Sequence, residues 1–375
     1  MKKIQELRKQ LHQHPELSGH ETQTAARICS FLEEHTSANL LKGIGGEGVA
    51  AVFECSDSGP VLLFRCELDA LPIEEPNAFP HRSSVKGVSH KCGHDGHMAI
   101  VAGLGLWLEQ QDLGQGKVIL LFQPAEETGA GAAAVLEDPR FRALKPDYCF
   151  ALHNLPGEPL HQIIKIDGYF SATVQSVAIY LQGKQSHASE PEKGINPALG
   201  LAELVQQLAF CTVPEPERED FALLTPVHLK LGELAYGISA GSGELHYTLR
   251  TWTEEEMERL KKRLLKAVES ICHKHQLTYS TDWFDYFPAT RNDSRNNSFI
   301  EKAAAAKGFD LKERPQPYKF GEDFSWFSRE YSSAMFGLGA GTTSPALHHA
   351  DYDFPDELLE TGIRMFAGIV EGILK

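Results

Sequence analysis

Chemically reactive side chains are concentrated in residues 90–97, where three histidines, a cysteine and an aspartate precede an apolar run from Met98 to Leu108. The chain has 17 His among 375 residues, so this local density is unusual. Imidazole, thiolate and carboxylate groups together suit a borderline-soft divalent ion such as zinc, manganese, cobalt or nickel. Backbone amides at the start of the helix predicted from His94 also favour a thiolate. These residues predict a metal site; the alternative is a polar loop that caps a helix.

Further candidate ligands lie where predicted buried strands end. Apolar runs over residues 61–69, 118–123 and 148–153 each stop at acidic or histidine side chains. In open α/β sheets, sites gather at the carboxyl ends of the strands. We therefore predict that these side chains share one site with residues 90–97, together with a histidine near the C-terminus. The set comprises Asp69, Glu126, Glu127, His153 and His348.

Length and pattern predict two domains. A chain of 375 residues is too long for one small core. Up to about residue 168, strands alternate with helices, which is typical of a mainly parallel sheet with helices on both faces. Residues 169–286 follow a β-α-β-β-α-β order, which is typical of a ferredoxin-like α+β module. The prediction is an α/β domain formed by residues 1–168 and 287–375, with residues 169–286 inserted as a second domain.

Composition narrows the functional class. A formal charge of -15 argues against nucleic acid or an anionic membrane as a partner. No apolar run approaches the roughly 18–20 residues that span a bilayer, and the charged N-terminus does not look like a signal peptide. The 7 cysteines are scattered and odd in number, which does not suit a disulfide framework. We therefore expect a cytoplasmic protein.

Five ordered segments resemble the amidohydrolase branch of the aminoacylase and carboxypeptidase-type di-metal peptidases. That branch includes hippurate hydrolases, auxin–amino acid conjugate hydrolases and N-acetyldiaminopimelate deacetylases. The likeness covers essentially the whole chain. The segments are Leu11–Ser18 (LHQHPELS), Arg65–Pro72 (RCELDALP), Cys92–His97 (CGHDGH), Gln123–Glu127 (QPAEE) and Ser186–Pro191 (SHASEP).

The resemblance implies a centre of two divalent metal ions and a role for each matching side chain. Glu126 matches the general base, and Asp69 matches a carboxylate behind the metal ions. His187 matches the inserted-domain histidine that contacts the reacting carbonyl, and Arg250 matches an arginine that binds the substrate carboxylate. The resemblance also implies a homodimer formed through the inserted domain. The matching metal ligands are Cys92, His94, Glu127, His153 and His348, with Cys92 between the ions.

This chain departs from its relatives at three places. Many relatives have Asp where this chain has Glu67, so the longer carboxylate could shift the groups behind the metal ligands. Relatives usually carry an Asn-Val-Ile-Pro-like turn before the arginine strand, whereas this chain reads Gly237–Gly241. His349 stands beside His348, and the Leu-His pattern of the family favours His348.

Other histidines and cysteines have ordinary interpretations. We predict that four histidines lie on the surface and that six cysteines are small core residues. These are His12, His14, His273 and His275, and Cys29, Cys55, Cys66, Cys149, Cys211 and Cys272.

The predicted function is hydrolysis of N-acyl amino acids with acetyl, benzoyl or aryl-acyl groups, by metal-activated water with a glutamate base. One alternative is a dipeptidase or carboxypeptidase that uses the same site on a peptide. A second is a cysteine hydrolase with Cys92 as nucleophile. A third is a catalytically weakened binding protein. This alternative is supported by the sequence Gly237–Gly241, which lacks the asparagine of the Asn-Val-Ile-Pro-like turn.

Overall fold

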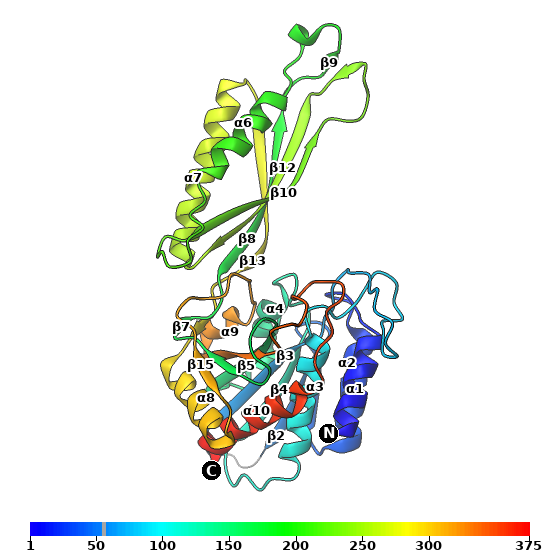
Figure 1. Cartoon of the computed structure of the whole chain (residues 1–375), viewed down its shortest axis with the longest axis vertical. Coiled ribbons are helices and arrows are strands. Elements are labelled where there is room, and N and C mark those ends of the chain that lie inside the picture. Colours follow the sequence, from blue (N-terminus) through cyan, green and yellow to red (C-terminus); the bar gives the residue numbers. More distant parts are fainter. Residues whose placement is uncertain (55–57) are drawn as a thin grey trace. The chain divides into compact units, whose positions relative to one another are not determined.

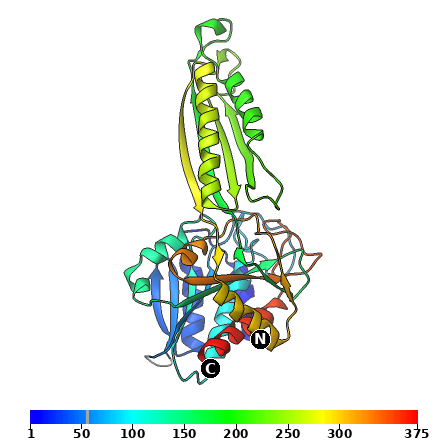
Figure 2. The same cartoon turned by 90° about the vertical axis from the view of Figure 1, so that its left-hand side faces the viewer.

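The computed structural model describes residues 1–54 and 58–375, and these divide into two compact units (Figure 1, Figure 2). Cys55 therefore lies outside the described residues. The first unit comprises Met1–Phe170, Thr290–Pro315 and Asp323–Lys375, and the second comprises Ser171–Ala289 and Gln316–Glu322.

The sheet of the first unit has the strand order β1-β2-β4-β3-β5-β16-β6-β15. Its central strands β4, β3, β5 and β16 are parallel, whereas β2 and β6 flank them in antiparallel pairing. Apolar side chains are buried on both faces of these central strands, as parallel strands covered on both sides require. The bounds are β1 Asn39–Ile44, β2 Gly48–Glu54, β3 Val61–Glu67, β4 Lys117–Gln123, β5 Tyr148–Leu155, β6 Ile163–Lys165, β15 Leu311–Glu313 and β16 Ser332–Gly339.

Helices pack on both faces of this sheet. Successive side chains of a strand point to opposite faces. Phe64 therefore joins the core that contains α1, α2, α3, α8 and α10, whereas Arg65 lies on the other face and bonds Asp323, just before α9. The bounds are α1 Lys2–Gln13, α2 Thr22–His35, α3 His94–Leu108, α4 Gly131–Glu137, α5 Pro139–Arg142, α8 Ser294–Lys307, α9 Ser325–Glu330 and α10 Leu358–Leu374.

The second unit contains an antiparallel sheet of order β10-β12-β8-β13, with α6 and α7 packed on it. Helix α7 begins after Thr253, whose side chain accepts a hydrogen bond from the Glu256 amide, and three acidic residues occupy its first turn. The bounds are β8 Thr173–Gln182, β9 Ser186–His187, a 3₁₀ turn Pro191–Lys193, α6 Ala198–Ala209, β10 Ala222–Leu231, β11 Ile238–Ser239, β12 Ser242–Thr251, α7 Glu254–Lys274 and β13 Thr278–Phe287.

The chain leaves and re-enters the first unit at neighbouring positions. Strand β7 (Gly168–Tyr169) pairs with β14 (Arg291–Asn292), and the Phe170 amide donates to the Thr290 carbonyl at 2.7 Å. The predicted α/β fold with an inserted ferredoxin-like module is confirmed. One segment differs from the predicted division, because Tyr318 forms a bridge with Ser171 and residues 316–322 pack with the second unit.

Strand β10 starts at Ala222, and its residues Ala222 and Leu224 pack in the core of the second unit. Within the described residues, no helix combines the length and the apolar character needed to cross a bilayer.

Candidate functional site

The carboxyl ends of three neighbouring parallel strands carry predicted site residues. Asp69 follows β3, Glu126 and Glu127 follow β4, and His153 lies near the end of β5. Helix α3 begins at His94, next to the same strand ends. The structure therefore brings side chains from distant parts of the sequence together at one edge of the sheet, as strand topology requires.

Gly93 makes the turn that separates Cys92 from α3. Its φ of +92° lies in the left-handed region, which favours glycine. A Cβ at this position would lie only 2.7 Å from the side-chain nitrogen of Asn154. Glycine is thus required both for the backbone conformation and for the close approach to β5.

His94 is buried, and Asp69 orients its ring. Its Nδ1 lies 2.9 Å from the Asp69 carbonyl oxygen. Its Nε2 lies 3.9 Å from a carboxylate oxygen of Glu126 and 3.8 Å from one of Glu127, and within the described residues it makes no hydrogen bond. Burial alone would lower the pKa of His94, but the bond to Asp69 and the nearby carboxylates raise it to about 10. The surroundings of this nitrogen therefore favour a positive charge.

Cys92 lies just before α3 and close to His153 of β5. Its thiol is buried, with Sγ 3.5 Å from Nε2 of His153. Burial raises the pKa of the Cys92 thiol well above its usual value, and the charges of Glu127 and Glu126 raise it further. A thiolate at this position therefore needs a cation beside it.

Glu127 and His348 complete a second group around Cys92. Nε2 of His348 lies 3.8 Å from a carboxylate oxygen of Glu127, although the His348 side chain is 52% exposed. His349 turns elsewhere, with its Nδ1 3.7 Å from the Asp351 carboxylate. The structure thus brings His348, and not His349, to the cluster.

Asp69 also contacts the glutamate segment. Its Oδ2 accepts hydrogen bonds from the Ser18 hydroxyl at 2.7 Å and from the Glu127 amide at 2.9 Å. Burial alone would raise the pKa of the Asp69 carboxyl, but the bonds from His94 and from the Glu127 amide lower it. Asp69 is therefore an ionised carboxylate that orients both a histidine and the backbone that carries the paired glutamates.

The donor atoms fit divalent metal ions. Cys92, His94 and His153 form one group, and Cys92, Glu127 and His348 form another. Within each group, one potential ligand atom per residue lies within 4.8 Å of the others, and Cys92 is common to both. Sulfur, imidazole nitrogen and carboxylate oxygen are the donors that zinc-type sites use.

Two predicted site residues belong to the second unit. His187 is exposed on β9, with Nδ1 2.7 Å from the Ser189 hydroxyl. Arg250 lies on β12 and donates to the Lys319 carbonyl at 2.6 Å, and burial lowers the pKa of its guanidinium.

Sequence reasoning missed a buried layer of polar side chains next to the candidate metal ligands, formed by His97, Glu67 and Arg65. Nδ1 of His97 lies 2.6 Å from the Glu67 carboxylate, which also bonds Arg65, and the His97 ring contacts that of His153. The spacing of His94 and His97 places both on one face of a helix, and this signal could have identified His97.

The interpretation of His12 as a surface residue is wrong. Its side chain is fully buried and lies 2.8 Å from Asp95 and 3.1 Å from Glu75. His14 and His273 are exposed, and His275 is partly buried. Among the cysteines, the core prediction is confirmed for Cys29, Cys66, Cys149 and Cys272, whereas Cys211 is only partly buried.

Comparisons with known proteins identify the family of this chain. The sequence model of peptidase family M20/M25/M40 matches residues 63–372. An N-acetylcysteine deacetylase of Bacillus subtilis strain 168 is 29% identical over 98% of this chain and 96% of its own length. An N-acetyl-L-cysteine deacetylase of the same strain is 32% identical over 88% of this chain and 79% of its own length.

Solved structures show the same fold. The Bacillus subtilis YXEP protein, described as a dinuclear metal binding peptidase of the M20 family, superposes with a TM-score of 0.83 and 27% identity. The match covers 100% of this chain and 98% of that one. A putative aminohydrolase from methicillin-resistant Staphylococcus aureus gives a TM-score of 0.87 at 24% identity, over 100% and 97% of the two chains. The resemblance seen in the motifs is confirmed: the chain is a metal-dependent hydrolase of peptidase family M20/M25/M40.

Proposed function

We propose that this hydrolase uses two divalent metal ions to cleave the amide bond of N-acylated amino acids. The observation that carries the proposal is the position of Cys92, whose thiol belongs to two of the groups that could hold a metal ion: one with His94 and His153, and one with Glu127 and His348. The two Bacillus subtilis relatives, named for deacetylation of N-acetylcysteine, support an N-acyl amino acid as substrate. The YXEP protein, described as dinuclear, supports two ions.

The proposed ligands come from two strand ends, the start of α3 and the connection before α10. When bound, the ions would polarise the amide carbonyl and make water more acidic. Zinc, manganese, cobalt and nickel all accept these donor types, so geometry and supply select among them. The residues that would hold the ions are Cys92, His94, Glu127, His153 and His348, and Cys92 is common to the two proposed groups.

Glu126 is the proposed general base. The residue is buried, its carboxylate lies 3.9 Å from Nε2 of His94, and it is next in sequence to the proposed ligand Glu127. In this role the carboxylate takes a proton from the attacking water and passes it to the nitrogen of the leaving amino acid. Asp69 acts indirectly, because it orients His94 and the Glu127 amide.

The second unit supplies the proposed contacts with the acyl amino acid. His187 would donate a hydrogen bond to the carbonyl oxygen, which strengthens as negative charge develops there. Arg250 would pair with the substrate carboxylate, for which a guanidinium offers two parallel donors. Both residues stand on strands of the second unit.

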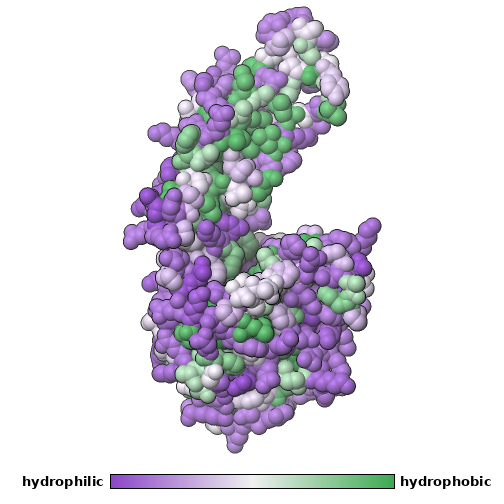
Figure 3. Space-filling model, in the orientation of Figure 1, coloured by the Kyte–Doolittle hydropathy of each residue, from purple (hydrophilic) through white to green (hydrophobic). Residues whose placement is uncertain are grey.

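A homodimer formed through the second unit is part of the proposal. Strand β10 lies at the edge of its sheet, and Val227, Leu229 and Leu231 are exposed along it. Figure 3 shows hydrophobic side chains gathered over this unit. An exposed apolar edge strand is suited to pairing with a second copy of the chain. Gel filtration with light scattering tests this: Leu229→Lys should shift a dimer toward a monomer.

A cytoplasmic location also belongs to the proposal. The odd number of cysteines fits a reducing compartment. The described cysteines, Cys92 among them, are free thiols.

A substrate panel on metal-reconstituted protein tests the function. Acetyl- and benzoyl-amino acids, N-acetylcysteine included, should be cleaved faster than unblocked dipeptides. The opposite order would favour a dipeptidase or carboxypeptidase that uses the same side chains. Activity that survives chelation and is lost on alkylation would favour Cys92 as a nucleophile. Binding of N-acyl amino acids without turnover in fully loaded protein would favour a binding homologue.

A further inference from the structure

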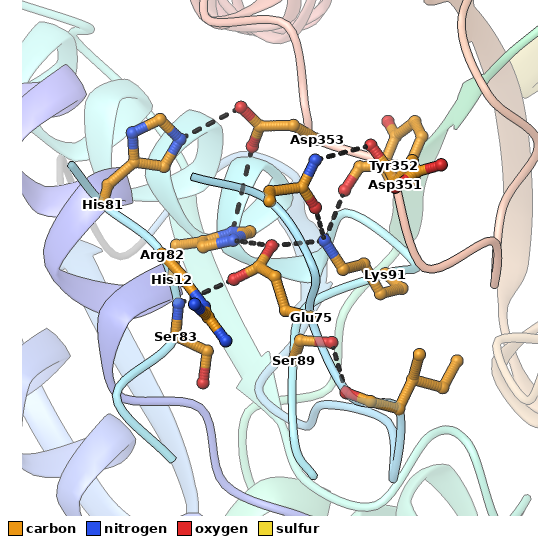
Figure 4. Close-up of polar contacts among 12 residues, drawn as sticks. His12, Glu75, His81, Arg82, Ser83, Ser89, Lys91, Asp351, Tyr352 and Asp353 are labelled. Carbon is orange, nitrogen blue, oxygen red and sulfur yellow. Dashed lines mark hydrogen bonds and ion pairs between the residues drawn. The ribbon is translucent and has the colours of Figure 1, made fainter. Parts of the chain in front are cut away.

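Lys91, which precedes Cys92, directs its ammonium group into the interior of the first unit, where the side chain is fully buried. Its Nζ donates hydrogen bonds to the Glu75 carboxylate, to Oδ1 of Asn77 at 3.0 Å and to the Tyr352 carbonyl at 2.7 Å (Figure 4). Three acceptors match the three donors of an ammonium group. Burying an ammonium group without hydrogen-bond partners costs free energy, and these three contacts offset that cost.

The main chain of Lys91 also contacts the connection that carries Tyr352, which comprises residues 340–357 between β16 and α10. Its carbonyl accepts a hydrogen bond from the His348 amide at 2.8 Å. His348 has a φ of +63°, a left-handed conformation that residues other than glycine adopt rarely and that persists where surrounding groups fix it. Lys91 thus holds this connection twice, through its carbonyl at His348 and through its ammonium at Tyr352.

The partners of Lys91 are themselves anchored. His12 of α1 lies 3.1 Å from the Glu75 carboxylate, and Figure 4 shows these two side chains beside Lys91. Tyr352 is buried, and its hydroxyl accepts a hydrogen bond from the Asn154 side chain on β5. The contact between the segment before Cys92 and the connection before α10 is therefore braced by a helix on one side and by the sheet on the other.

We propose that Lys91 is a positioning residue that fixes His348 relative to Cys92, and so sets the affinity for the metal ion that both share with Glu127. The inference rests on the proposed metal ligation. His348 is the candidate ligand most in need of such support, because its side chain is half exposed and stands on a long irregular connection. Residues that orient metal ligands typically change metal affinity about 10–100-fold when they are removed.

The experiment titrates zinc ions into metal-free full-length protein against a chromophoric chelator. It compares wild type, Lys91→Met, His348→Ala and the double variant Lys91→Met/His348→Ala. Lys165→Met is the matched control, because Lys165, on β6, is also buried. Its Nζ donates a hydrogen bond to the Glu301 carboxylate at 2.6 Å. Lys91→Met/Glu75→Gln removes both charges, so it replaces Lys91→Met if that variant fails to fold.

We expect Lys91→Met to lower the affinity for the second zinc ion about 10–100-fold. In the His348→Ala background, the same substitution should lower this affinity little further. Lys165→Met should bind both ions as wild type does. Wild-type zinc affinity in folded Lys91→Met or Lys91→Met/Glu75→Gln would overturn the inference, even if thermal stability falls. Additive losses in Lys91→Met/His348→Ala would also overturn it. If His348→Ala itself keeps both ions, the proposed ligation fails, and the inference with it, whatever Lys91→Met does.

Discussion

Two oxygen atoms of Asp69 face the same ring nitrogen of His94: the carbonyl lies 2.9 Å and a carboxylate oxygen 3.3 Å from Nδ1. This contact sets the orientation of the imidazole, so that Nε2 is directed toward Glu126 and Glu127. A ligand histidine whose second nitrogen is held in this way is already oriented for a metal ion.

Replacing Asp69 with Asn should therefore weaken metal binding about 10–100-fold, because the amide keeps the shape but loses the charge that holds His94. Competition with a chelator measures the change. Asp147→Asn is a suitable control, since Asp147 accepts a hydrogen bond from the Val61 amide at the opposite end of β3. Equal metal affinities in the two variants would contradict the role given to Asp69.

Glu126→Gln should abolish most turnover while metal content stays intact. The amide cannot accept a proton from water, a task typically worth about 10²–10⁴-fold in rate. Elemental analysis and kcat on an N-acyl amino acid measure the two effects separately. Glu127→Gln should instead lose metal content as its primary defect. Near-wild-type kcat in Glu126→Gln would show that another group is the base.

Metal affinity should rise with pH. The pKa of His94 is raised to about 10 and that of Cys92 well above its usual value, so both groups carry protons at neutral pH. A metal ion must displace these protons, and each proton released makes the affinity about ten times greater per pH unit. Chelator competition between about pH 6 and pH 8, with proton release followed in weak buffer, tests this. An affinity independent of pH in this range would be inconsistent with the protonated state of these ligands.

Acid should destabilise the fold partly through Glu75. Burial alone would raise the pKa of its carboxyl, but hydrogen bonds from His12 and Lys91 lower it to about 2. A carboxyl group with a lowered pKa stabilises the fold above its unfolded value of about 4.3, and this contribution is lost as pH falls toward 2. Urea unfolding should thus show a weaker loss of stability between about pH 4.5 and pH 2 in Glu75→Gln than in wild type. Glu54→Gln, at a surface ion pair with Lys117, should retain the wild-type pH dependence.

His187 should act at an active site from the second unit, and a mixed dimer can show whether it serves its own chain. His187→Ala and Glu126→Gln chains, each of which we expect to be inactive alone, are combined and allowed to exchange subunits. Activity recovered in the mixture means that His187 serves the site of its neighbour. No recovery after proven exchange restricts it to its own chain, and a fully active His187→Ala homodimer removes it from the mechanism.

The strand ends were predictable from local pattern. The apolar runs that became β3, β4 and β5 are bounded by acidic residues or histidine, and parallel strands bring such ends to one edge. Local pattern could not separate His348 from His349, because both are histidines of one connection, and only the Leu-His pattern of the family favoured His348. The left-handed backbone of His348 and its bond to Lys91 decide which side chain reaches Glu127.

The buried polar contacts of Lys91 and His12 were not predictable from one sequence. A lysine such as Lys91 is usually exposed, and its burial depends on Glu75 and Tyr352, which lie far apart in the chain. His12 is a similar case, because its partner Asp95 comes from another helix. Charge compensation of this kind exists only after the chain has folded.

The paired strands β7 and β14 mean that the polypeptide returns to the first unit one strand away from where it left. Residues 171–289 thus form a long insert whose two ends are joined by this strand pair, and the closing of this pair does not depend on what the insert contains. Another insert with its ends one strand spacing apart could occupy the same place. If His187 and Arg250 contact the substrate as proposed, such an exchange would alter the substrate contacts and leave the metal-binding residues of the first unit unchanged.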